Sequence, residues 1–142
     1  MIEIRELSVA DYDAICEVWR ACGTKLRPQG RESRESFARQ MAGGTQMVLG
    51  AFTDGRLVGV SLVTHDGRKG WINRLGVLPD CQRQGIGAGL IRASEKLLHD
   101  NGLTIVAALV EHYNAASLSL FQHEGYHVED TYYVTKRDSP DA

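Results

Sequence analysis

A glycine-rich stretch joins two segments of different pattern and limits how this chain can fold. Residues 82–88 read Q-R-Q-G-I-G-A; they follow an apolar, strand-like run at 71–78 and open a helical pattern that continues to about residue 99. The next run, 103–110, is almost continuously apolar, which is typical of a strand buried on both faces of a sheet. A strand, a helix and a second strand in this order predict two parallel neighbours in one sheet.

The glycine stretch has the features of an anion-binding loop. Gly85 and Gly87 lack a Cβ, so a ligand can approach the backbone closely, and amides at a helix start favour negative charge. Each amide donated to an ionised oxygen contributes about 1.5–3 kcal/mol, so about three or four would anchor a pyrophosphate. The lysine of a Walker loop is missing, and the spacing is not G-x-G-x-x-G. The stretch predicts an anion-bearing cofactor, with a simple tight turn as the alternative.

The remaining segments complete a sheet flanked by helices. Asp-Gly pairs at 54–55 and 66–67 predict an antiparallel meander of strands before the glycine stretch. Further strands are expected at 2–7, 46–52, 56–64, 126–128 and 132–135, and further helices at about 8–22, around 37–41 and at 115–123. This order indicates an α/β (mixed α+β) fold with a central, mixed, mostly antiparallel sheet of about seven strands and about four helices.

Length and composition exclude several classes of function. The 142 residues suit one domain, 1–142, of which 138–142 are expected to fray. A net charge of −2 offers no overall field for nucleic acid or an anionic membrane, and no apolar run approaches the ~18 residues that span a bilayer. The three cysteines form no C-x-x-C pair and indicate reduced thiols of a cytoplasmic protein, with no metal site. A homodimer is compatible with this size, although no feature specifies one.

Two motifs in this architecture resemble the GNAT N-acetyltransferases. V-L-P-D-C-Q-R-Q-G-I-G at 77–87 is similar to the family's acetyl-CoA pyrophosphate motif, and N-A-A-S-L-S-L-F-Q-H-E-G-Y at 114–126 to its later N-x-x-A-x-x-L-Y-x-x-x-G-F segment. Segments 66–73 and 19–23 further resemble a small bacterial, YpeA-like branch. The resemblance implies a GNAT-like fold, acetyl-CoA as acetyl donor, and direct transfer to a primary amine of a small molecule or a protein.

The resemblance also implies roles for matching positions. The strand before the loop would pair with the pantetheine arm, the loop amides would take the pyrophosphate, and the two parallel strands would splay beside them, after Leu78 and Val110. Asn114 would reach pantetheine or the thioester, and its residue type also suits a helix N-cap. The implied cofactor-binding residues are Leu75, Gly76, Val77, Gln82, Arg83, Gln84, Gly85, Ile86, Gly87, Ala88, Asn114, Ser117 and Phe121.

One position departs from the family pattern. The tyrosine that often acts as acid in the family is Phe121 here, which can only pack. Deprotonating an alkylamine at pH 7 costs about 4.6 kcal/mol, whereas releasing a thiolate costs only ~2 kcal/mol, so a base matters more than an acid. We expect Tyr113 and Glu111 to be the catalytic groups. Other ionisable residues at strand ends, which are also typical of solvated turns, are His112, His65 and Asp66.

The acceptor side carries an excess of positive charge. Residues 25–39 hold five cations against Glu32 and Glu35. With Arg27 and Arg31 as binding residues, this favours an acceptor that carries a carboxylate over a polyamine, and a solvated helix face is the alternative.

Two other functions fit parts of the pattern. A catalytically silent acyl-CoA-binding module would bind cofactor without releasing thiol with any amine. A protein that binds NAD or ATP through the glycine loop would be expected to begin with a βαβ unit, which this chain does not. Cys81 lies beside the loop, but direct transfer needs no nucleophile there.

Overall fold

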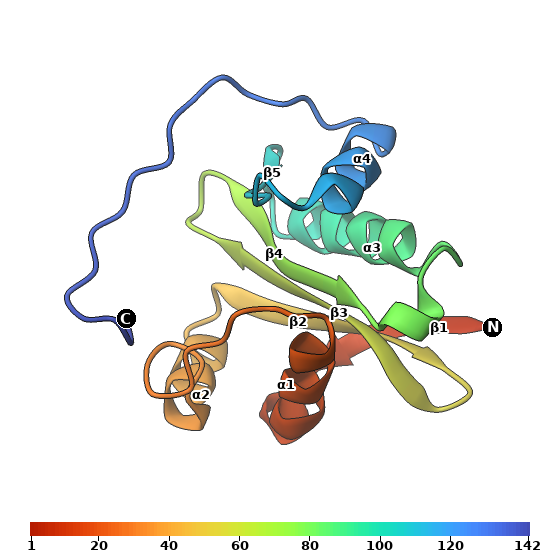
Figure 1. Ribbon diagram of the computed structural model, residues 1–142, viewed down its shortest axis with the longest axis horizontal. Helices are drawn as coiled ribbons and strands as arrows, with labels where there is room; N and C mark the ends of the chain where they lie inside the picture. Colours follow the sequence, from red (N-terminus) through yellow and green to blue (C-terminus); the bar gives the residue numbers. More distant parts are fainter.

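Five strands form one sheet in the computed structural model, which describes residues 1–142. They are β1 (Ile2–Leu7), β2 (Gln46–Thr53), β3 (Arg56–His65), β4 (Gly70–Val77) and β5 (Val106–Ala108), in the spatial order β1-β2-β3-β4-β5. Neighbouring strands are antiparallel except β4 and β5, which are parallel. The predicted meander and the predicted parallel pair are both confirmed (Figure 1).

The helices cover both faces of the sheet. They are α1 (Tyr12–Ala21), α2 (Arg34–Ala42), α3 (Ile86–Asp100) and α4 (Ala115–His123), with 3₁₀ turns η1 (Val9–Asp11) and η2 (Pro79–Cys81). Figure 1 shows α1 and α2 on one side of the sheet and α3 on the other, with α4 beyond α3. A capping box begins η1, since the Ser8 and Asp11 side chains each accept a hydrogen bond from the other residue's end of the turn. None of these helices has the length and apolar character of a membrane span.

Most buried apolar side chains lie between the sheet and its two long helices. On α1, Ile15 and Trp19 face the sheet four residues apart, as the helical repeat requires, and Ile86 and Leu90 do the same on α3. These residues belong to a cluster of 14 buried residues, against which Leu75 and Val77 of β4 pack. Gly59 on β3 allows this packing, because a Cβ there would lie 2.9 Å from a Leu90 methyl carbon.

The C-terminal part of the prediction is wrong. No strand forms at 126–128 or 132–135, so the sheet has five strands rather than seven. Strand propensity reflects packing against a neighbouring strand, and after α4 the chain runs away from the free edge of β5 with Tyr132 and Val134 exposed (Figure 1). The strand predicted at 103–110 is also shorter in the structure. β5 covers only the three residues that pair with residues 70–72 of β4, because a strand forms only where it has a neighbouring strand.

Candidate functional site

The two parallel strands, β4 and β5, separate at one edge of the sheet. Pairing of β4 with β5 ends at Ile72 opposite Ala108, whereas β4 continues to Val77 bonded to β3 alone. The splay expected from the resemblance is present and begins earlier than Leu78 and Val110. One edge of β4 therefore has no strand partner from residue 73 to residue 77, and only the Arg74 and Val77 carbonyls of this stretch accept side-chain hydrogen bonds, from Trp19 and Gln82.

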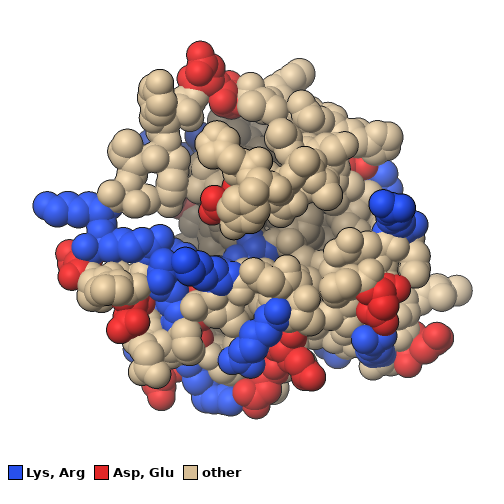
Figure 2. Space-filling view, viewed as in Figure 1, with Lys and Arg blue, Asp and Glu red and all other residues tan.

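A large cavity lies along this opening. Its volume is about 1750 Å³, and it is bounded by the end of α1 and residues 23–32, by residues 72–75 of β4, by residues 104–114 and by α4. The C-terminal segment supplies further lining, including Tyr133. Figure 2 shows the hollow between the upper and lower halves of the view, with Lys and Arg side chains gathered on its left side.

The glycine loop follows β4 and presents free amides. Gly85 has φ +81° and starts α3 without a side-chain cap, and none of the amides from 82 to 88 donates to another group of the protein. The Gln82 side chain donates to the Val77 carbonyl at 3.1 Å and ties the loop to β4. The loop itself lies outside the cavity lining, so the structure places it at the end of β4 rather than around the hollow.

The start of α4 lines the cavity with three residues that the sequence singled out. The Asn114 side-chain oxygen accepts the Ser117 amide at 3.1 Å, which confirms the N-cap, and its NH₂ group has no partner in the protein. Phe121 is buried against Ile72 and packs edge-on to Tyr126, with ring centroids 5.1 Å apart. Phe121 therefore acts as a packing residue.

Tyr126 is tied to α3. Its hydroxyl donates to Glu95 at 2.7 Å, and burial, together with the Glu95 carboxylate, raises the pKa of Tyr126 far above its usual value. The phenol is thereby kept protonated.

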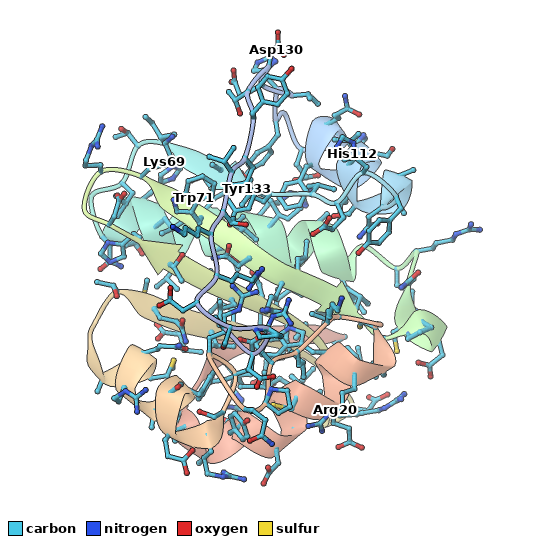
Figure 3. All side chains as sticks on the ribbon, turned by 60° about the vertical axis from the view of Figure 1, so that its left-hand side comes forward. Arg20, Lys69, Trp71, His112, Asp130 and Tyr133 are labelled. Atoms are coloured by element: carbon cyan, nitrogen blue, oxygen red, sulfur yellow. The ribbon has the colours of Figure 1, made fainter.

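The two expected catalytic residues lie on the loop between β5 and α4. Tyr113 and Glu111 both line the cavity, and the Tyr113 side chain is 86% exposed. His112, between them, also lines the cavity, and Figure 3 shows it on the same loop.

Asp66 has a different role, away from the cavity. It closes the turn after β3 by accepting the amides of Arg68 and Lys69 at 2.8 and 2.9 Å. His65, beside it, accepts the Gly67 amide at 3.3 Å in the same turn. Neither residue lines the cavity, so the structure does not bring them to the expected catalytic loop.

A buried ion pair joins β4 to the segment between α1 and α2. Arg74 lies at a bulge, where pairing between β3 and β4 shifts, and has φ +44°. Its guanidinium donates to Glu32 at 2.6 Å and to the Lys25 carbonyl at 2.9 Å, and Trp19 donates to the Arg74 carbonyl at 2.8 Å. The side chains of Arg74 and Glu32 are only 17% and 8% exposed. Burial lowers the pKa of Arg74, and Glu32 opposes that shift.

The two arginines expected to bind the acceptor are both engaged. The Arg31 Nε atom pairs with Glu32 at 3.1 Å, and the Arg27 guanidinium donates to the Pro140 carbonyl at 2.8 Å. The Arg27 amide donates to Glu32 as well, at 3.1 Å. The Glu32 carboxylate is thus the centre around which this segment is ordered.

Sequence reasoning missed Arg74 as a site residue. The signal that could have found it is the polar pair Asn73-Arg74 within the apolar run W-I-N-R-L-G-V of β4. A charged side chain inside a central strand requires a partner, and Glu32 is the acid that the topology brings to it.

Comparison with known proteins agrees with this architecture. The family model described as "Acetyltransferase (GNAT) family" matches residues 12–126. An acetyltransferase of Yersinia enterocolitica is 28% identical over 136 residues, which cover 96% of this chain and 95% of the relative. An acetyltransferase of Pectobacterium atrosepticum is 29% identical over the same length.

Solved structures share the fold. The PaiA N-acetyltransferase of Thermoplasma acidophilum, solved in complex with coenzyme A, superposes with a TM-score of 0.79 at 25% identity and 92% coverage of both chains. A ribosomal-protein-alanine N-acetyltransferase of Brucella melitensis biovar Abortus, at 16% identity, shares the fold with a TM-score of 0.79 over 96% of this chain and all of the other. The family model matches most of this chain, and the chain has splayed parallel strands beside a glycine loop. This chain is a member of the GNAT acetyltransferase family.

Proposed function

We propose that residues 1–142 form one domain that transfers an acetyl group from acetyl-CoA directly to a primary amine. The observation that carries this proposal is the unpaired edge of β4 leading to a loop of free amides at the start of α3. Residues 75–77 would pair with the pantetheine arm as an added strand would, and the loop would hold the pyrophosphate. The coenzyme A complex of the Thermoplasma relative supports the same donor.

The loop fits a phosphate ligand sterically. Gly85 has a backbone conformation that residues with a side chain rarely adopt, and no atom of the protein lies within 4 Å of where its Cβ would be. Gly87 is closed on one side by α4, since a Cβ there would lie 2.8 Å from a Leu120 methyl carbon. A side chain at position 87 would therefore collide with α4, whereas one at position 85 would meet no other part of the protein.

The acceptor must lose a proton for the reaction to proceed. The acceptor nitrogen bonds to the acetyl carbon of the thioester, the carbon–sulfur bond breaks, and the sulfur leaves with the electron pair. Holding the amine neutral at pH 7 costs about 4.6 kcal/mol, which favours a base or a water chain near the amine. Glu111 and Tyr113 are proposed for that proton path, because both line the cavity on the loop after β5.

The acceptor is proposed to carry a carboxylate. Lys25, Arg27, Arg31 and Arg74 line the same side of the cavity, opposed there by Glu32. Because positively charged side chains are concentrated on this wall, an acidic acceptor is favoured over a polyamine.

The first test is the melting temperature with acetyl-CoA, NAD or ATP at equal concentration. A ligand at about 100 times its Kd adds ~2.7 kcal/mol, which raises Tm by several degrees for a domain of this size. A shift with acetyl-CoA alone, followed by thiol release with amines, is expected. A larger shift with NAD or ATP would overturn the proposal, and acetyl-CoA binding without thiol release from any amine would indicate a silent binding module.

Two glycine variants separate cofactor binding from backbone strain. Gly85→Ala and Gly55→Ala both place a Cβ at a φ near +80° with no atom within 4 Å, and only Gly85 belongs to the loop. Each should lower stability by about 1–2 kcal/mol through strain. Only Gly85→Ala should reduce the Tm shift caused by acetyl-CoA; equal shifts in both variants would contradict the role of the loop.

A further inference from the structure

Arg74 differs from the other cations of the cavity wall in burial and in anchoring. Its side chain is 17% exposed, whereas that of Arg31 is 51% exposed and is turned to Glu32. One N–H of each terminal nitrogen is used, toward Lys25 and Glu32, and the remaining N–H groups of the guanidinium donate to no atom of the protein. A guanidinium held in this way is oriented in advance and still has donors for a ligand.

The surroundings of Arg74 favour an incoming anion. Glu32 is its only close counter-ion, and Glu32 is shared with Arg31 and with the Arg27 amide. The charges of Arg31 and Arg27 act on Arg74 in the unfavourable direction, so the cluster keeps an excess of positive charge beside the cavity. Because Arg74 is mostly removed from water, a carboxylate that reaches it gains more than at the exposed Arg31.

Arg74 adjoins the part of β4 that is proposed to pair with the cofactor arm. Arg74 immediately precedes Leu75, the first residue proposed to pair with the cofactor arm. A carboxylate bound at Arg74 would therefore lie beside the proposed cofactor arm, which favours a small acceptor over a long one.

Resting on the proposed transferase function, we propose that Arg74, oriented by Glu32, binds the carboxylate of the acceptor, and that the acceptors are short amino acids with a free carboxylate near the amine. Arg27 and Arg31 then shape the loop rather than make the main contact. In this assignment Arg74 determines specificity and Glu32 is a positioning residue.

The test compares each acid with its amide. Thiol release from acetyl-CoA is measured with the free L-amino acids, with their carboxamides, and with putrescine and spermidine. The unsubstituted protein should prefer acids over the matching amides by at least about tenfold in kcat/KM, which corresponds to ~1.4 kcal/mol. Preference for amides or polyamines would overturn this inference while leaving the transferase function in place.

Variants then assign the preference to Arg74. Asparagine tolerates positive φ, so Arg74→Asn removes the guanidinium with little backbone strain and should raise KM for acids about tenfold while lowering kcat/KM for amides much less. A merely structural role would lower both together. Arg74→Lys keeps the charge without the planar fork and should keep part of the preference. If Arg74→Asn does not fold, Arg74→Lys tests the same preference. Acid preference that persists in both variants would overturn the proposal.

Three further variants serve as comparisons. Glu32→Gln should weaken the acid preference, because it releases the guanidinium from its anchor. Arg31→Ala should weaken it less than Arg74→Asn. Arg56→Asn removes an exposed arginine that pairs with Asp80 outside the cavity and should leave the preference unchanged.

A binding measurement separates this inference from the proposed function. The Tm of the protein saturated with CoA is recorded with an amino acid and with its amide. An acid-specific rise that is lost in Arg74→Asn supports the carboxylate site even if no amine releases thiol, which would overturn the transferase function alone. No acid-specific rise and no acid-specific turnover would overturn the carboxylate site.

Discussion

The part of the molecule up to α3 and the part after it are held in different ways. The cluster of 14 buried residues ends at Leu90, and it packs α1 and α3 against the sheet. After Asp100 only Leu103 and Phe121 are buried, and the segment from residue 127 to residue 142 is exposed throughout. The second part is held to α3 partly by polar contacts, from Arg92 to Glu124 at 2.9 and 3.1 Å and from Tyr126 to Glu95.

This difference divides the cavity into a firm wall and a loosely held wall. Trp19, Arg74 and Leu75 belong to, or pack against, the part with the large core, so their geometry is set by close packing. Tyr113 and Asn114 belong to the part with little buried apolar surface, where local opening costs less free energy. The two walls of the cavity therefore differ in how much buried apolar surface holds them in place.

The largest contrast is expected for one substitution made in each part. Leu90→Ala on α3 removes a fully buried side chain and should lower the free energy of unfolding by about 2–5 kcal/mol. Leu118→Ala on α4 truncates a side chain that is 38% exposed and should cost less than about 1 kcal/mol. Urea denaturation of both variants measures the difference. Equal losses would show that α4 is packed as firmly as α3.

A smaller effect is expected where the two parts are joined. Arg92→Gln leaves the buried Glu124 carboxylate without its partner, while the 67% exposure of the arginine limits the loss to about 1 kcal/mol. Amide exchange should rise about fivefold in α4 and not in β3, because the opening is local.

Lys96→Gln is the matched control for that junction. It also removes a cation from α3, but from an exposed pair with Asp100 that touches nothing beyond the helix. It should leave exchange in α4 unchanged. Faster exchange in both variants would mean that the ion pair to Glu124 has no special role in holding α4.

What the sequence could predict does not follow this division, because it depends on local signals that occur in both parts. The meander, the parallel pair and the Asn114 cap depend on local signals, namely Asp-Gly turns, helical repeats and a cap residue, and these survive in the fold. The two C-terminal strands depended on a partner in space, and no local pattern supplies one.

The pairing of Arg74 with Glu32 has the same origin. It joins residues 42 positions apart at a bulge in β4, and the local sequence around either residue does not indicate its partner. Local patterns therefore predicted the start of α3 and the cap of α4, while the ion pair of Arg74 with Glu32 required the tertiary structure.

The smallest expected effect concerns the turn before β4, at the edge of the firm part. Amides of Lys69 and then Arg68 lower the pKa of Asp66 below its usual 3.8, so the folded state favours the carboxylate and the unfolded state binds the proton more readily. The stabilisation is therefore present above about pH 4 and is lost as the pH falls through the lower pKa of the folded state. Asp66→Asn removes this dependence. The urea midpoints of the two proteins should differ slightly at pH 6 and converge toward pH 3; a gap that widens on acidification would show that the turn does not hold Asp66 as the ion.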